Sequence, residues 1–171
     1  MGSSGIDTAR LRNALGSFAT GVTVVTTRDA DGVDRGVTAN SFTSVSLDPP
    51  LVLWSLGKRS SSLEAFMHAE HFAVNVLAEG QEPLSDRFSS RGVDRFAGLE
   101  VARGRQGLAL LHGCASHFEC RVHRRHEGGD HWIFVGEVEA FRNFERLPLL
   151  FHGGRYRALR LRFEETGLAA G

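Results

Sequence analysis

The sequence predicts a mostly β fold, an antiparallel barrel with a few peripheral helices. Two observations favour this class. Many short segments rich in β-branched and aromatic residues are separated by turn residues, and the few helical patterns do not alternate regularly with strands. A doubly wound parallel sheet is therefore not expected. No Gly-x-Gly-x-x-Gly stands between a strand and a helix, so the common dinucleotide-binding motif is also missing.

The first predicted element is an amphipathic helix near the N-terminus. Asp7 is a suitable N-cap residue. Leu11, Ala14, Leu15 and Phe18 follow at i, i+3, i+4 and i+7, the spacing of one apolar stripe. We therefore expect this helix to lie against a sheet.

A β-hairpin is expected next. Residues 22–27 are rich in β-branched side chains, residues 29–32 supply turn chemistry, and a second extended run continues through Val37. Residues 38–46 alternate small polar groups with few large ones, and the following Asp-Pro-Pro disfavours a helix. This segment is expected to be a structured loop with an extended stretch.

Leu51–Leu56 is predicted to be a buried strand because all six residues but one are apolar. The serines of residues 57–62 are good caps for a helix that begins near Leu63, and Phe72–Leu77 is predicted as the next strand. A helix is plausible over Glu82–Arg91, since Leu84 and Phe88 are four residues apart.

Two long extended runs are expected at residues 115–123 and 131–141, and the glycine-containing segment 124–130 is predicted to connect them as a hairpin. A loop is expected at residues 91–95. After Pro148, residues 149–152 and 156–161 can add one or two edge strands. Five of the twelve phenylalanines are expected to be core residues, namely Phe18, Phe42, Phe72, Phe88 and Phe96.

Length, charge and composition limit the functional classes. The 171 residues suit a single domain over 1–171, and 20 basic residues balance 20 acidic ones, so no overall field would attract nucleic acid. The longest clear apolar run has six residues, far below the roughly 20 that cross a bilayer, and no secretory leader is evident, so we expect a cytoplasmic protein. The two cysteines, Cys114 and Cys120, are expected to be reduced, half-buried thiols.

Loop residues 38–46 and 58–62 together could hold an anion. They bring hydroxyl groups, one side-chain amide, a lysine and an arginine close to predicted strand ends, and a helix start adds oriented N–H groups. Lys58 is the only lysine in the chain. The alternative is that the serines only cap a helix and that both loops are solvated. The residue pattern alone leaves both interpretations open.

Other polar groups give weaker indications. The eight histidines have no carboxylate or thiol at a spacing typical of a metal site, so no metal is expected. The basic run 121–126 would divide its charges between two faces of a strand and is expected to be mostly solvated, although contact with a dinucleotide phosphate remains an alternative.

Several long blocks resemble the flavin reductase family, the small split-barrel reductases that supply reduced flavin to two-component monooxygenases. Residues 12–27 resemble its N-terminal block, and residues 36–50 are similar to its flavin-binding block, which 58–62 continue. Gly129-Asp130-His131 resembles the short motif on the nicotinamide side, and 149–159 its closing strands. The resemblance covers about residues 10–162 and implies an FMN-binding split barrel.

The resemblance also implies an FMN or FAD site at a homodimer interface. The flavin phosphate would lie near the serines and the lysine, and the isoalloxazine and ribityl parts along residues 38–40. The residues expected to bind the cofactor are Thr38, Ala39, Asn40, Ser41, Ser44, Ser55, Lys58, Ser60, Ser61 and Arg91.

The activity that the resemblance implies is NAD(P)H:flavin oxidoreduction. NADH or NADPH would stack on the flavin and pass a hydride from nicotinamide C4 to flavin N5, so no catalytic acid–base residue of the protein is required. His131 is assigned to the nicotinamide side. Two alternatives remain: a flavin-binding or carrier protein without productive dinucleotide access, and a split-barrel FMN oxidase with its own organic substrate.

Overall fold

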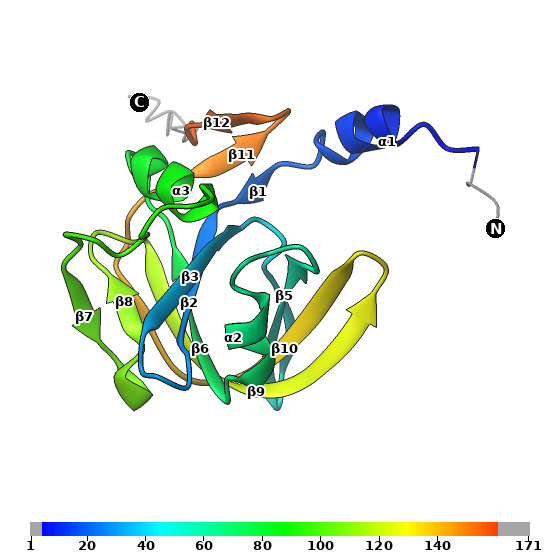
Figure 1. The fold of residues 1–171 in the computed structure, drawn as a ribbon. Coiled ribbons are helices and arrows are strands. Elements are labelled where there is room, and N and C mark those ends of the chain that lie inside the picture. The colour runs from blue at the N-terminus through cyan, green and yellow to red at the C-terminus, as the bar shows by residue number, and fades with distance from the viewer. Residues whose placement is uncertain (1–4, 161–171) are drawn as a thin grey trace, which may run out of the picture.

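The computed structural model describes residues 5–160 and confirms the predicted mostly β fold with few helices (Figure 1). The α-helices are α1 (Thr8–Leu15), α2 (Leu63–His68) and α3 (Glu82–Ser89), with a short 3-10 helix at Arg105–Gly107. The strands are β1 (Thr20–Gly21), β2 (Thr23–Arg28), β3 (Asp34–Ala39), β4 (Thr43–Leu47), β5 (Pro50–Gly57), β6 (His71–Val76), β7 (Val101–Arg103), β8 (Ala109–Leu111), β9 (Ser116–Gly128), β10 (His131–Asn143), β11 (Leu150–His152) and β12 (Arg155–Arg157).

Seven strands form one antiparallel sheet in the order β3-β2-β6-β9-β10-β5-β4. The sheet curls, so that β3 and β5, although they are not paired strands, come into contact. Two small sheets, β1-β11-β12 and β7-β8, lie beside the large one (Figure 1). The curled sheet is the barrel that the sequence predicts, and its open seam lies between β3 and β5.

The barrel interior is packed with aromatic side chains. Trp54 stacks on Phe134 with ring centroids 4.8 Å apart and meets Phe66 and Phe72 edge-on at 4.9 and 5.9 Å. All four side chains are fully buried or nearly so. Gly136 is required here, because a Cβ at this position would lie 2.4 Å from the Phe72 ring. A second cluster, which includes Phe88, Leu111 and Leu149, packs on the outer side of the barrel wall.

Strand β5 differs in burial from its prediction. Val52, Trp54 and Leu56 are buried, whereas the residues between them are only partly buried, so one face of the strand points into the barrel. The β9–β10 hairpin is also longer than expected. Residues 124–127 belong to β9 and pair with β10, and the turn is confined to the residues around Gly129, whose φ is +66°. The charged residues and glycines of segment 124–130 predicted a loop, but most of the segment is strand.

Helix α1 forms where predicted, with the Asp7 side chain accepting hydrogen bonds from Ala9 N and Arg10 N at 2.9 and 3.1 Å. Its predicted docking on the sheet is wrong. No residue of α1 is buried, and Figure 1 shows the helix on an arm that extends away from the barrel. Leu15 is 67% exposed, and Phe18 is 77% exposed and is therefore not a core residue. The apolar stripe has no partner within the described residues.

Strands β7 and β8 have no counterpart in the sequence prediction. They are joined to the barrel by the buried Asn75, whose Oδ1 accepts from Leu111 N at 2.8 Å and whose Nδ2 donates to Val24 O at 3.0 Å. Cys114 and Cys120 are both free and fully buried rather than half-buried, and burial raises the pKa of each thiol to about 12. No helix among the described residues is long and apolar enough to span a membrane.

Candidate functional site

A hollow of about 540 Å³ lies beside the barrel seam. Its walls come from the ends of β3 and β5, the start of β10, the loop before α2 and the segment after α3. This volume is within the range typical of small-molecule sites. Most of the residues that the resemblance assigns to cofactor binding line it. They are Thr38, Ala39, Asn40, Ser41, Ser55, Ser60, Ser61 and Arg91. His131, which the resemblance assigns to the nicotinamide side, lines the hollow as well.

Ser41 closes the seam on which the hollow is built. Its Oγ accepts a hydrogen bond from Ser55 N at 2.8 Å and donates to Ser55 O at 3.2 Å, so it ties the end of β3 to β5. Thr38 has a similar role, because its hydroxyl donates to Ser85 O of α3 at 2.6 Å. Both hydroxyls already have protein partners. They shape the walls of the hollow, and the backbone of residues 38–41 is left to face a ligand.

Two of the predicted residues do not line the hollow. Ser44 is exposed on β4, a strand that the sequence analysis described only as an extended stretch. Lys58 does not line the hollow either, because its Nζ forms an ion pair with Glu127 of the β9–β10 hairpin. The same pair lowers the pKa of Glu127. The contact of Lys58 with a flavin phosphate stays a prediction.

The serine loop before α2 is arranged differently from a simple cap. Ser62 is the N-cap residue but makes no side-chain capping hydrogen bond. Ser60 Oγ instead accepts from Ser62 N at 3.2 Å, and the Ser61 side chain has no protein partner within the described residues. Both Ser60 and Ser61 border the hollow. Their hydroxyl hydrogens therefore remain available as donors to a bound anion.

His131 begins β10 and pairs with Gly57, the residue at the end of β5 just before the serine loop. Its Nδ1 is 2.7 Å from Asp130 Oδ1, and this hydrogen bond lowers the pKa of the Asp130 carboxyl. The imidazole lies over Gly57, where an added Cβ would be 3.6 Å from Nε2. With Nδ1 committed to Asp130, Nε2 is the nitrogen left to meet a ligand.

The sequence analysis underestimated the arginines of this region. Arg59 and Arg95 line the hollow together with Arg91, and no aspartate or glutamate lines it. None of the three forms an ion pair with a carboxylate of the described residues. The charge of Arg59 helps to lower the pKa of Asp130, but without direct contact. Residues 91–95 form no helix, so the i, i+4 spacing of Arg91 and Arg95 did not mark them as neighbours. A hollow lined by guanidinium and hydroxyl groups suits a phosphate-bearing ligand.

The basic run 121–126 has internal partners instead. Arg121 pairs with Glu137 at 2.7 Å, and Arg125 donates to the carbonyls of Phe66 and Ala69 beneath α2. These residues lie on β9 and do not line the hollow, although the carbonyl of Asp130 at the hairpin tip accepts a hydrogen bond from Lys58 N at 2.9 Å. Arg121, His123, Arg124 and His126 are exposed, as expected for a mostly solvated run, whereas Arg125 is partly buried.

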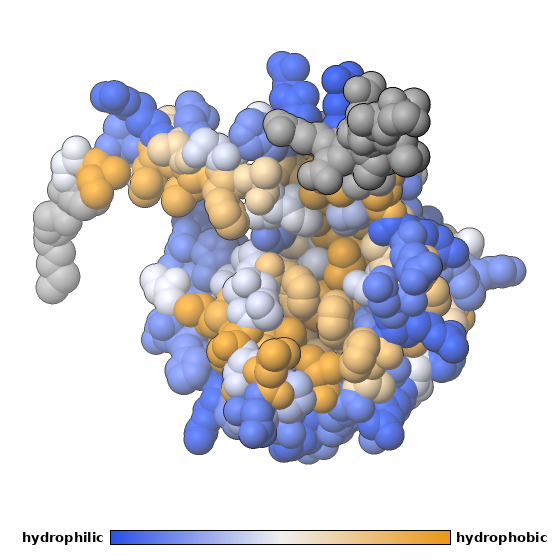
Figure 2. All heavy atoms as spheres, turned by 180° about the vertical axis from the view of Figure 1, so that it is seen from behind, coloured by the Kyte–Doolittle hydropathy of each residue, from blue (hydrophilic) through white to orange (hydrophobic). Residues whose placement is uncertain are grey.

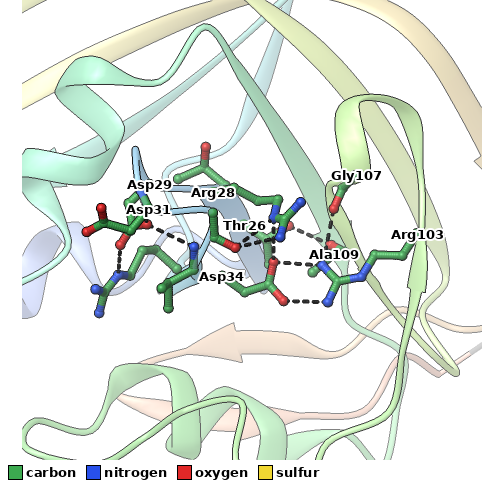
Figure 3. Close-up of polar contacts among 12 residues, drawn as sticks. Thr26, Arg28, Asp29, Asp31, Asp34, Arg103, Gly107 and Ala109 are labelled. Atoms are coloured by element: carbon green, nitrogen blue, oxygen red, sulfur yellow. Dashed lines mark hydrogen bonds and ion pairs between the residues drawn. The ribbon is translucent and has the colours of Figure 1, made fainter.

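A second hollow of about 580 Å³ lies between α2 and the β2–β3 hairpin. Its lining is mixed in charge, and Arg35 there is held by Asp29 at 2.8 Å. Figure 3 shows the polar contacts around Asp29 and Asp34 in this corner of the molecule. No group of three or more His, Cys, Asp or Glu suited to a metal ion occurs among residues 5–160.

The curled antiparallel barrel, with a hollow lined by arginine and serine side chains at its seam, has the architecture of a split-barrel protein. The comparison with protein families then gives the family: the model described as "Flavin reductase like domain" matches residues 15–160, so the chain belongs to the flavin reductase family, as its sequence predicts.

Several curated proteins and solved structures are similar to the chain. It is 44% identical over 152 residues to the HsaB reductase subunit of a flavin-dependent monooxygenase from Rhodococcus jostii (strain RHA1), covering 88% of this chain and 77% of that protein. It is 47% identical to the FMN reductase (NADH) SmoA of Agrobacterium fabrum (strain C58 / ATCC 33970), covering 89% and 86%. Some other relatives are longer, and the chain spans about half of their length, 47% to 50%.

Among solved structures, the NADH:FAD oxidoreductase SgcE6 of Streptomyces globisporus C-1027 superposes with a TM-score of 0.85 at 42% identity, covering 94% of this chain and 98% of that one. A further structure of SgcE6 is a complex with NAD and FAD fragments, with a TM-score of 0.83. The split-barrel fold predicted for this chain is thereby confirmed.

Proposed function

We propose that this chain is an NADH-dependent flavin reductase that reduces FMN or FAD and supplies the reduced flavin to a separate monooxygenase. The observation that carries the proposal is the hollow at the β3–β5 seam, which combines three arginines, free serine hydroxyls and His131 without an acidic lining residue. The relatives support the same activity, since SmoA is an FMN reductase that uses NADH, SgcE6 is an NADH:FAD oxidoreductase and HsaB is a monooxygenase reductase subunit.

The residues present fit a flavin. Arg59, Arg91 and Arg95 supply positive charge that no carboxylate of the described residues neutralises by an ion pair, and the hollow has room for a ring system beside them. A bound flavin supplies the chemistry, because its isoalloxazine accepts a hydride from the nicotinamide. The protein then has to bind, orient and shield the two reactants.

Each wall has a separate task in this proposal. The backbone of residues 38–41, fixed by the Ser41–Ser55 hydrogen bonds, positions the ring system along the seam. Ser60, Ser61 and the arginines hold the phosphate. His131, oriented by Asp130, offers Nε2 to the dinucleotide. The Ser41 and Thr38 hydroxyls act through wall geometry, since both have protein partners.

A homodimer completes the proposal. Figure 2 shows apolar side chains gathered on the N-terminal arm and on the barrel face across from it. The exposed apolar residues include Ile6, Leu11, Leu15 and Phe18 of the arm and Leu47 and Phe141 of β4 and β10. An eight-residue helix is marginal in water without a packing partner. A second copy of the chain would cover both surfaces, and light scattering of the purified protein tests this: a monomeric mass at micromolar concentration would contradict it.

The proposed substrates are NADH and either FMN or FAD. NADH is proposed rather than NADPH because the names of the relatives specify NADH. So are the single domain and the cytoplasmic location expected from the sequence. The decisive experiment mixes the purified chain with NADH and free FMN or FAD under anaerobic conditions and follows absorbance at 340 nm. We expect flavin-dependent oxidation of NADH and the release of reduced flavin.

The two alternatives give different results in the same experiment. A flavin carrier would bind flavin without oxidising NADH or NADPH. An oxidase with its own substrate would retain its flavin through gel filtration and would not transfer reduced flavin to free acceptor. NADH oxidation that requires added flavin, with the flavin lost on desalting, separates the reductase from both.

A further inference from the structure

Arg95 occupies an unusual place at the back of the hollow. Its Nη1 donates to Gly36 O of β3 at 2.6 Å and to Ser62 Oγ at the start of α2 at 3.0 Å. Its Nε and Nη2 donate to Ser90 O, just after α3, at 3.1 and 2.8 Å. One guanidinium thus joins three elements that build the walls of the hollow.

The charge of Arg95 is not balanced inside the protein. All of the acceptors of its hydrogen bonds are neutral, and it has no ion pair with a carboxylate of residues 5–160. Partial burial lowers the pKa of Arg95, which shows that its surroundings penalise the cation. An arginine nevertheless keeps its proton, so an anion bound beside Arg95 would offset the part of the desolvation cost that its neutral acceptors leave.

The donor count of Arg95 is also incomplete. A guanidinium has five N–H groups. The hydrogen bonds to Gly36, Ser62 and Ser90 use four of them, so one N–H on Nη2 has no acceptor among the described residues. Arg59 and Arg91, which line the same hollow, lie nearer its exposed rim, since both side chains are exposed whereas Arg95 is partly buried.

We propose that Arg95 is a binding residue for the phosphate monoester of the flavin and that it couples phosphate binding to the position of β3. The inference rests on the proposed function and deepens it. A phosphate dianion in the hollow would balance the partly buried cation and hold the Arg95 side chain in place, and Arg95 in turn donates to Gly36 O. Gly36 precedes residues 38–41 on the same strand, so the anion fixes the wall along which the ring system lies.

Arg125 offers a matched control. It too is partly buried, burial lowers its pKa, and it donates only to backbone carbonyls, those of Phe66 and Ala69. It lies outside the hollow, however, under the end of α2. If carbonyl bonding were the whole purpose of Arg95, substitutions at the two positions would have the same consequences for flavin use.

The experiment compares FMN with riboflavin, which has the same ring and ribityl chain but no phosphate. For R95Q and R95K we expect the KM for FMN to rise about 10-fold and about 3-fold, respectively, because a charged hydrogen bond is lost or weakened. The KM for riboflavin should change less than about twofold, and R125K should affect both flavins equally. The FMN-to-riboflavin selectivity is the readout that a purely structural role would not move.

Each outcome of this experiment supports or overturns the proposed role of Arg95. Equal losses for FMN and riboflavin in R95Q and R95K would overturn the proposal and make Arg95 a structural residue like Arg125. If R95Q does not fold, R95K carries the comparison alone. If the wild-type protein oxidises NADH with neither flavin, the proposed function fails, while equilibrium binding of FMN and riboflavin, followed by flavin fluorescence, still tests Arg95: an unchanged FMN preference in R95K would refute its role.

Discussion

Two arginine clusters of the molecule differ in where their charge is balanced. In the corner between the β2–β3 and β7–β8 hairpins, Arg103 makes a two-pronged contact with Asp34 at 2.7 Å for each prong, and Arg28 approaches the same carboxylate at 3.5 Å (Figure 3). Arg35 pairs with Asp29 at 2.8 Å. In the hollow at the seam, Arg59, Arg91 and Arg95 have no such partner among residues 5–160.

The difference teaches that counting basic residues does not locate a binding site. The chain has 20 basic residues and no net charge, and both clusters look alike in the sequence. Only the fold shows that the arginines of the corner have carboxylate partners, whereas those of the hollow have none among residues 5–160. Substitutions in the two clusters should therefore act on different properties.

Charge reversal in the hollow should give the largest effect. We expect Arg59→Glu to raise the KM for FMN about 100-fold, since it replaces an attraction to the phosphate dianion with a repulsion. The free energy of unfolding should change by less than about 0.5 kcal/mol, because Arg59 is exposed and has no ion pair to lose. Steady-state kinetics with saturating NADH measures the first quantity and urea unfolding the second.

The matched reversal in the corner is Arg35→Glu, which places a second acid beside Asp29. It should leave the KM for FMN within about twofold of wild type. A KM that rises equally in both variants would show that only the overall charge of the protein matters, and the contrast between the clusters would be lost.

Removal of the central carboxylate in the corner should lower stability. We expect Asp34→Asn to reduce the free energy of unfolding by about 1.5 to 2 kcal/mol, because its side chain is only 13% exposed and holds Arg103 and Arg28 together. Urea unfolding gives the change. The double variant with Arg103→Gln isolates the pair, and an Asp34→Asn protein as stable as wild type would show that the corner is not a structural ion-pair network.

How far the sequence could predict this molecule depends on the range of the interactions. The β2–β3 hairpin, β6 and the N-cap of α1 were predicted because their signals are local: β-branched runs, turn residues and a capping aspartate. The docking of α1 was wrong because an apolar stripe shows that a helix needs a partner but not which one. Residues 124–127 resemble a loop in composition, yet pairing with β10 extends them as a strand.

The candidate site divides in the same way. Contiguous residues such as 38–41 and 60–61 were found from the family resemblance, and the fold brings them together with His131. Arg95 was missed because its role arises from contacts with Gly36 and Ser62, 59 and 33 residues away along the chain. Lys58 was placed in the hollow from its sequence neighbours, whereas its side chain pairs with Glu127 on another strand.

The third prediction tests whether His131 contacts the dinucleotide while the arginines of the hollow contact the flavin. We expect His131→Ala to raise the KM for NADH about fivefold, because Nε2 no longer meets the dinucleotide, and to leave the KM for FMN within about 1.5-fold. Steady-state titrations of each substrate at saturating concentrations of the other provide both values. An equal rise in the two would move His131 to the flavin side and would mean that arginines and histidine act on one ligand.

Salt should have the smallest effect and should separate the clusters without any substitution. Raising the ionic strength from about 0.05 M to about 0.5 M shortens the screening length to a few ångströms, so the exposed Arg59 and Arg91 should attract a phosphate less and the KM for FMN should rise about threefold. Riboflavin, without a phosphate, should respond less.

The corner should resist the same change in ionic strength, since Asp34 and Arg103 are in direct contact and the Asp34 side chain is mostly buried. The melting temperature of the protein should therefore stay within about 2 °C. A melting temperature that falls while the KM for FMN stays constant would reverse the assignment of the two clusters.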